Sequence, residues 1–231
     1  MKKEDIVALY RRRAGNYDLT ANLYYLIGYR EWAYRREAVS ALGLGRGDTV
    51  VEVCSGTGMN FPLFEEAVGP EGRIIGVDIT DAMLEKARER ARRRGWRNVE
   101  LVQADAARYE FPPGINGVIS SFAITLVPEY DAVIRRGCEA LAPGGRFVVL
   151  DLKAPSNWLS ALTPLLLLLV RPFGGRREVV ERTPWRSIEK YLGNLSMKEL
   201  YGGMSYLAWG QKAAGPLERL GQAAGQPRTL K

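Results

Sequence analysis

The middle of the chain alternates short apolar, β-branched runs with longer stretches in which apolar positions recur about every third or fourth residue. Strands joined by amphipathic helices are typical of βαβ units, so this pattern predicts a parallel sheet with helices on both faces. The strands are expected at about Thr49–Cys54, Arg73–Asp78, Val99–Gln103, Gly117–Ser121 and Gly145–Leu152.

The clearest predicted helix runs from Asp81 to Arg94, with Thr80 as its N-cap and Gly95 as its stop. Its glutamates stand three or four positions from arginines, so the many arginines indicate a solvated helix face rather than a nucleic-acid-binding stripe. The apolar positions expected to share its buried face are Met83, Ala87 and Ala91.

The first 45 residues form a different kind of segment. They are helical in pattern and rich in tyrosine and arginine, and they end at the glycine-rich breaker Gly43–Asp48. We therefore expect a helical N-terminal lid at residues 1–45 and a cofactor-binding domain at residues 46–212. A flexible tail is expected at residues 213–231.

The first predicted strand leads into a turn of small residues, Cys54–Gly58, with the acid Glu52 just before it. Glycine has no Cβ and accepts positive φ, so such a turn lets the backbone approach a ligand closely. The second strand ends in Asp78, where an acid can accept both hydroxyls of a ribose. A dinucleotide site needs a glycine three positions after Gly58, and this chain has Phe61 there. A cofactor without a pyrophosphate is therefore favoured over a nicotinamide dinucleotide.

These segments resemble the motifs of class I S-adenosylmethionine-dependent methyltransferases, over residues 17–210. VEVCSGTG is similar to the acid-x-Gly-x-Gly-x-Gly loop, with Cys54 in place of the first glycine, and GVDIT resembles the ribose-binding strand end. QADAA resembles the adenine-binding position, and LAPGGRFVVLDL the fifth strand. The resemblance implies an α/β, Rossmann-like, mostly parallel sheet of seven strands whose last strand is antiparallel.

The same resemblance implies S-adenosylmethionine as cofactor and S-adenosylhomocysteine as product. Glu52 is expected near the cofactor's amino group, Asp78 on its ribose and Asp105 on its adenine, while Ser121 and Phe122 border the methyl group. The full set of expected cofactor-binding residues is Tyr17, Glu52, Cys54, Ser55, Gly56, Thr57, Gly58, Asn60, Asp78, Ile79, Met83, Asp105, Ala106, Ser121 and Phe122.

Histidine is absent from the sequence, which argues against Ser-His and Cys-His hydrolases and against His-ligated metals. The two cysteines, Cys54 and Cys138, lack CxxC spacing, so neither a disulfide framework nor a zinc site is indicated, and no metal is expected. A proton acceptor must then be a carboxylate, a tyrosine, a lysine or water. Tyr17, Tyr25 and Glu129 are the candidate catalytic residues.

A formal net charge of +7 suits an anionic partner but does not choose among nucleic acid, lipid and an acidic ligand. Ser121–Leu126, after the fourth strand, supplies neither a Pro-Pro-aromatic clamp nor a nucleophilic cysteine, so nucleic acid is not expected as a substrate. The N-terminus has no signal-peptide core, and no apolar run reaches the roughly twenty residues of a spanning helix. We expect a cytoplasmic protein, with peripheral membrane association as an option.

Tyr17-Asp18 and Tyr206–Gly210 look similar to two groups of the class, the bacterial phospholipid N-methyltransferases and the ubiquinone and menaquinone C-methyltransferases. We therefore expect a small-molecule or lipid substrate, with a phospholipid amine favoured over a quinone precursor. The apolar stretch Trp158–Val170 has basic flanks at Lys153, Arg171, Arg176 and Arg177. It is either an element at an anionic membrane surface or a buried helix. A catalytically silent cofactor-binding module and a nicotinamide dehydrogenase are the alternatives of other classes.

Overall fold

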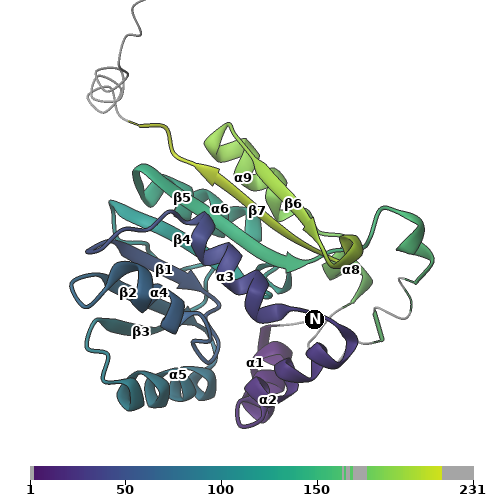
Figure 1. Ribbon diagram of the computed structural model, residues 1–231, viewed down its shortest axis with the longest axis horizontal. Helices are drawn as coiled ribbons and strands as arrows, with labels where there is room; N and C mark the ends of the chain where they lie inside the picture. Colours follow the sequence, from purple (N-terminus) through teal and green to yellow (C-terminus); the bar gives the residue numbers. More distant parts are fainter. Residues whose placement is uncertain (1–2, 163, 165–166, 169–175, 215–231) are drawn as a thin grey trace, which may run out of the picture.

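The computed structural model describes residues 3–162, 164, 167–168 and 176–214, with the backbone alone at 21–24 and 162. A seven-stranded sheet of order β3-β2-β1-β4-β5-β7-β6 forms its centre (Figure 1). β7 is antiparallel to β5 and β6, and the other neighbours are parallel. The expected Rossmann-like sheet is thereby confirmed. The strands are β1 (Thr49–Val53), β2 (Arg73–Asp78), β3 (Val99–Gln103), β4 (Ile115–Ser121), β5 (Leu141–Leu152), β6 (Ser196–Leu200) and β7 (Ser205–Gln211).

Two strands begin earlier than the sequence pattern predicted. β4 begins at Ile115 and β5 at Leu141, because these two residues pair before the register shifts to Gly117 and Arg146. The glycine-rich turn before Arg146, in which Gly144 has a φ of 80°, is therefore an irregularity inside β5 and not the segment that precedes it.

Helices cover both faces of the sheet (Figure 1). Successive residues of a strand point to opposite faces, so Val50 packs with Phe64 of α4 and Ala38 of α3, while Val51 packs with Val133 of α6. Each face thus has its own buried hydrophobic cluster. The flanking helices are α3 (Glu31–Ala41), α4 (Phe61–Val68) and α5 (Asp81–Arg94) on one side, and α6 (Tyr130–Ala140) and α9 (Pro184–Leu192) on the other.

The long helix α5 has the predicted bounds, and Met83, Ala87 and Ala91 lie on its buried side. Gly95 closes it in the left-handed conformation, with a φ of 71°. Thr80 is the N-cap residue, as predicted, but its side chain does not cap the helix. The backbone N–H of Thr80 is bound by Asp78.

The N-terminal residues form several short helices ahead of α3. α1 lies beside α5 and buries none of its residues, which distinguishes it from the helices packed on the sheet (Figure 1). These elements are α1 (Lys3–Arg13), α2 (Tyr17–Asn22) and the 3-10 helix η1 (Leu23–Ile27).

The segment after β5 differs from a buried helix wherever it is described. It starts with the 3-10 helix η3 (Trp158–Leu162), where Trp158 is 81% exposed, and Leu168 is exposed as well. Residues 163, 165–166 and 169–175, including the expected flank at 171, lie outside the described residues. Lys153, expected as a basic flank, is buried and paired with Glu199 at 2.5 Å.

The helix packed between β5 and β6 comes later in the chain than expected. It is α9, preceded by the short α8 (Arg177–Val180), and Ile188 of α9 is fully buried against the sheet. Two further 3-10 turns, η2 (Ile124–Leu126) and η5 (Tyr201–Gly203), follow β4 and β6. Among the described helices, none combines the length and the apolar character needed to cross a membrane.

Candidate functional site

A cleft opens at the carboxyl ends of the central parallel strands. β1 lies between β2 and β4 in the sheet. The strands that follow β1 are added first on one side of it, as β2 and β3, and then on the other, as β4 and β5. Ligands of open α/β sheets bind at the carboxyl ends of the strands where the strand order reverses in this way. All of the predicted cofactor-binding residues except Gly58 and Asn60 line this cleft. α1 contributes a further part of its wall through Lys3, Ile6 and Tyr10.

The turn after β1 has the backbone conformation that its small residues predicted. Gly56 and Gly58 have φ values of 55° and 71°, and Cys54, which replaces a glycine of the related motif, is also left-handed at 58°. A Cβ at Gly58 would stand 2.6 Å from the ring of Phe61. Gly58 is therefore needed for packing against the start of α4, which explains why it does not line the cleft.

Asp78 ties the end of β2 to this turn. Its Oδ2 accepts the N–H of Gly56 at 2.8 Å, and its Oδ1 accepts the N–H of Thr80 at 2.8 Å. Burial raises the pKa of the Asp78 carboxyl, while these backbone N–H groups oppose the rise. Each carboxylate oxygen can accept more than one hydrogen bond, so Asp78 retains capacity for ribose hydroxyls.

Asp105, the expected adenine-binding residue, is held by the N-terminal helix. Lys3 Nζ lies 2.7 Å from Asp105 Oδ2 and 3.0 Å from Glu129 Oε1. Partial burial raises the pKa of Asp105, but the hydrogen bonds from Lys3 and from the N–H of Ala107 outweigh it, and the net pKa is lowered. α1 is thus fastened over the end of the cleft where adenine is expected.

The inner end of the cleft carries a buried polar network. Glu52 Oε1 accepts a hydrogen bond from Asn60 Nδ2 at 2.6 Å, and the same nitrogen lies 2.9 Å from Ser121 Oγ. Burial raises the pKa of Glu52 to about 8. Glu52 Oε2 is a buried oxygen without a hydrogen-bond partner. Asn60 belongs to this network but does not line the cleft.

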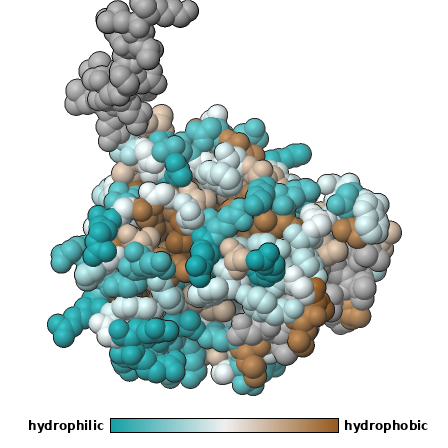
Figure 2. All heavy atoms as spheres, viewed as in Figure 1, coloured by the Kyte–Doolittle hydropathy of each residue, from teal (hydrophilic) through white to brown (hydrophobic). Residues whose placement is uncertain are grey.

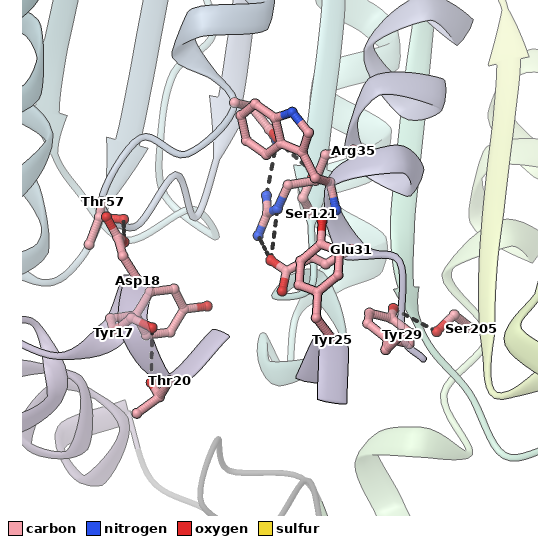
Figure 3. Close-up of polar contacts among 12 residues, drawn as sticks. Tyr17, Asp18, Thr20, Tyr25, Tyr29, Glu31, Arg35, Thr57, Ser121 and Ser205 are labelled. Carbon is pink, nitrogen blue, oxygen red and sulfur yellow. Dashed lines mark hydrogen bonds and ion pairs between the residues drawn. The ribbon is translucent and has the colours of Figure 1, made fainter. Parts of the chain in front are cut away.

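Aromatic rings line the outer part of the cleft. The ring centroids of Tyr10 and Tyr17 lie 6.0 Å apart, and burial raises the pKa of Tyr17 to about 12, so its hydroxyl keeps its proton at neutral pH. Phe122 has a left-handed φ of 57° and packs against Tyr29, whose hydroxyl is bound to Ser205 (Figure 3).

The three candidate catalytic residues are placed differently. Tyr17 lines the cleft. Glu129 is not one of the lining residues, but it follows the lining residue Pro128, is half exposed and pairs with Lys3, which lines the cleft. Tyr25 lies elsewhere: its hydroxyl accepts the N–H of Trp32, and its side chain is exposed (Figure 3). Tyr25 is therefore not brought into the cleft, and its hydroxyl binds the backbone at the start of α3 instead.

The sequence interpretation missed the cleft residues that come from the N-terminal helices. Lys3, Tyr10 and Arg35 line the cleft, and Asp18 accepts a hydrogen bond from Thr57 Oγ1 at 2.6 Å (Figure 3). A chemical signal existed only for Arg35, which stands four positions after Glu31 on one helical face. The other contacts depend on how the N-terminal segment folds back across the sheet.

These residues fit S-adenosylmethionine. Glu52 Oε2 is an unsatisfied buried acceptor suited to an ammonium, Asp78 suits a ribose, and Phe61 fills the space that a pyrophosphate-binding glycine would leave open. Within the described residues, no cluster of three cysteine, aspartate or glutamate side chains is arranged to hold a metal ion.

Comparison with known proteins gives a consistent result. The model of the ubiE/COQ5 methyltransferase family matches residues 1–175. A ubiquinone/menaquinone biosynthesis C-methyltransferase UbiE of Pseudomonas putida is 33% identical over 160 residues, covering 68% of this chain and 62% of the relative. Its namesake from Pasteurella multocida is 35% identical over 156 residues, covering 67% and 58%. The aligned part is therefore less than two thirds of these relatives' length.

Solved structures share the fold at low sequence identity. A SAM-dependent methyltransferase from Aquifex aeolicus superposes with a TM-score of 0.58 at 17% identity, covering 77% of this chain and 88% of that one. A phosphoethanolamine N-methyltransferase 2 from Haemonchus contortus, solved with S-adenosylhomocysteine, gives a TM-score of 0.63 at 15% identity, covering 80% and 53%. The family match, the sheet order and the cleft at the switch point agree, and the chain belongs to the ubiE/COQ5 methyltransferase family, with a cleft that fits S-adenosylmethionine.

Proposed function

We propose that this chain is an S-adenosylmethionine-dependent methyltransferase whose acceptor is the amine of a phospholipid head group. The observation that carries the choice of acceptor is the aromatic lining of the cleft, formed by Tyr10, Tyr17 and Phe122. Aromatic faces attract cations by about 0.5–2 kcal/mol, and a methylated amine is a cation. Neutral tyrosines are suited to this role, because they stabilise positive charge without accepting a proton.

Beyond binding, the site has to align the acceptor amine with the methyl group of the cofactor. When bound, S-adenosylmethionine supplies a methyl group already activated by its sulfonium. Asp78 holds the ribose, Glu52 meets the ammonium of the methionine end, and the rings of Tyr10 and Tyr17 exclude water from the approach of the amine. The amine must arrive uncharged and loses a proton once methylated, and Glu129, which follows the cleft residue Pro128, is the acceptor that remains among the sequence candidates.

Product analysis tests this assignment. The chain is incubated with methyl-labelled cofactor and vesicles that contain phosphatidylethanolamine, and lipids are separated by chromatography. We expect label in mono-, di- or trimethylated phosphatidylethanolamine, whereas vesicles of phosphatidylglycerol alone stay unlabelled. If neither lipid is labelled and a quinol is, the phospholipid amine is not the acceptor, and the quinone-precursor carbon described next takes its place.

A quinone-precursor carbon is the second candidate acceptor. It is favoured by the names of the 33–35% identical relatives, which are ubiquinone/menaquinone biosynthesis C-methyltransferases. Carbon methylation of a quinol requires loss of a hydroxyl proton. Burial raises the pKa of Tyr17 to about 12, so its hydroxyl is protonated at neutral pH and scarcely any phenolate is present to accept that proton. A demethylated quinol assayed beside the phospholipid separates the two acceptors directly.

A membrane surface suits either acceptor. Leu26 and Ile27 of η1 and Trp158 of η3 expose apolar side chains, and we call these three residues the apolar patch. The two segments meet at η5, since Tyr201 donates to the carbonyl of Ile27 and Asn157 to the carbonyl of Gly202. Figure 2 shows apolar surface at the lower right of the molecule, beside the part that Figure 1 labels α1 and α2.

Charge at the same end agrees with an anionic lipid surface. Arg30 stands three positions after Ile27, Arg176 and Arg177 follow the apolar stretch, and all three are exposed. Phe122 of the cleft packs against Tyr29, which packs against Tyr201 of η5, so ring contacts connect the cleft to this region. We infer that the chain acts from the aqueous phase on a lipid that it meets at a bilayer surface.

A further inference from the structure

Arg35 is a buried cation in the wall of the cofactor cleft. It comes from α3, is 4% exposed and lies beside Ser121 and Phe122 at the end of β4 (Figure 3). Its guanidinium is 5.0 Å from the centroid of the Phe122 ring. Burial of a charged group costs several kcal/mol unless partners compensate it, so a cation at this depth requires an explanation.

Glu31 and Asn60 hold the guanidinium in place but leave some of its N–H donors unused. Arg35 Nε donates to Glu31 Oε1 at 2.9 Å, and one terminal nitrogen lies 2.8 Å from the same oxygen. The other terminal nitrogen donates to Asn60 Oδ1 at 3.1 Å. The two terminal NH₂ groups carry four hydrogens, of which these contacts use two, so the group retains donors for another acceptor.

Asn60 connects this cation to a carboxyl group. Its oxygen binds Arg35, and its nitrogen binds Glu52, whose second oxygen is buried without a partner. The inner end of the cleft thus presents a guanidinium and an unsatisfied carboxyl on either side of one amide. That arrangement complements a zwitterion, a ligand with an ammonium and a carboxylate on one carbon.

We propose that Arg35 recognises the carboxylate of the cofactor's methionine end, opposite Glu52, which accepts from its ammonium. Glu31 and Asn60 are positioning residues that hold the guanidinium plane. The proposal rests on the cofactor assignment and not on the identity of the methyl acceptor. A purely structural Arg35–Glu31 pair would instead stabilise α3 and make no distinction between ligands with and without an amino-acid group.

Two ligands separate these roles. S-adenosylhomocysteine carries the amino-acid group, and 5′-methylthioadenosine keeps the adenine, ribose and thioether without it. For Arg35→Met, calorimetry is expected to show an affinity for S-adenosylhomocysteine weakened by about tenfold or more, and an affinity for methylthioadenosine within about twofold of wild type. Arg73→Met is the matched control, since Arg73 pairs with Glu100 away from the cleft.

Equal weakening of both ligands, or no weakening, would overturn the proposal, as would a wild-type protein that binds the two ligands equally well. Thermal unfolding of the free variants checks that Arg35→Met is folded. If it is not, Arg35→Lys keeps the charge without the planar fork and should lose affinity for S-adenosylhomocysteine selectively, by a smaller factor. Equal loss for both ligands in Arg35→Lys would again contradict a carboxylate-binding role.

Discussion

At the scale of single residues, two carboxyl groups on the central strands β1 and β5 are buried. Burial raises the pKa of Glu52 to about 8 and that of Asp151, at the end of β5, to about 6. Asp151 is satisfied by the N–H and hydroxyl of Thr125, whereas one oxygen of Glu52 lacks a partner. The free protein therefore tolerates Glu52 best in its protonated form.

The first prediction concerns stability against pH. The folded-state pKa of Glu52 lies above its ordinary value of 4.5, so between about pH 4.5 and pH 8 the unfolded chain releases a proton that the folded chain keeps. The free energy of unfolding should fall as pH rises through this window. Asp151 contributes the same sign only up to about pH 6.

Urea denaturation of the cofactor-free protein at pH 6 and pH 8 measures the effect. We expect Glu52→Gln to reduce the difference between the two pH values, because the amide does not ionise. Glu100→Gln, at an exposed ion pair, should leave the difference as it is in wild type. An undiminished difference in Glu52→Gln would show that Glu52 is not the titrating group.

The second prediction concerns Asp78. Asp78→Asn keeps one acceptor oxygen but loses the charge and one acceptor, and Asp78 also accepts the N–H groups of Gly56 and Thr80. Cofactor binding should weaken by about 1–3 kcal/mol, and the turn after β1 should lose stability. Calorimetry with S-adenosylhomocysteine measures the first effect. An unchanged dissociation constant would place the ribose elsewhere.

At the scale of elements, α1 is held by charge rather than by burial. None of its residues is buried, yet Lys3 pairs with Asp105, Arg11 with Asp81, and Asp18 of the neighbouring α2 with Arg90. Of these pairs, Arg11–Asp81 is exposed and the other two are partly buried. Exposed ion pairs are each worth about 0–1 kcal/mol and are screened by salt, and partly buried pairs are screened less. We propose that α1 and α2 form a lid that opens readily at the adenine end of the cleft.

A third prediction follows from this fastening. The rate of dissociation of S-adenosylhomocysteine, measured by stopped flow, should rise several-fold when salt is raised from about 0.05 M to about 1 M. The reason is that salt screens the ion pairs that hold α1 and α2 over the cleft. Arg11→Ala should show a faster rate at low salt and a weaker salt dependence. Arg135→Ala, at an ion pair on α6, should behave like wild type. A rate independent of salt would exclude an electrostatic lid.

At the scale of the whole molecule, apolar surface and positive charge occur at the same end. The chain has a formal net charge of +7, the apolar patch of Leu26, Ile27 and Trp158 is exposed, and Arg30, three positions after Ile27, is exposed as well. Buried apolar area contributes roughly 25 cal/mol per Å², and each basic residue near an anionic surface about 1 kcal/mol. The two contributions differ in their response to salt.

The fourth prediction uses that difference. The protein should cosediment with vesicles of phosphatidylglycerol, salt should weaken binding without abolishing it, and Leu26→Asp with Trp158→Asp should weaken it at all salt concentrations. Leu167→Glu tests the leucine-rich stretch: a membrane-facing stretch predicts weaker binding with stability retained, and a buried helix predicts severe destabilisation. Ser196→Asp, which adds the same charge at an exposed position on β6, at the end of that strand away from η5, is the control. Wild type that fails to bind at low salt would remove the membrane from the proposal.

The sequence by itself determined the sheet and the cofactor turn. Strand and helix periodicity predicted β2, β3 and α5 with their observed bounds, and glycines and strand-end acids such as Gly56 and Asp78 indicated a nucleoside site. These features are local, since side-chain period and backbone conformation depend on neighbours within a few positions. The carboxyl ends of parallel strands then necessarily meet at one edge.

Only the tertiary structure decided which N-terminal residues reach that edge. Lys3 meets Asp105 across 102 positions, and Arg35 meets Asn60 across 25, whereas Tyr25, chemically as suitable as Tyr17, is left outside the cleft. Such contacts depend on how helices fold back over the sheet, and the packing of the whole chain sets that path. No periodicity encodes it, because the partners are far apart in sequence and share no repeating pattern.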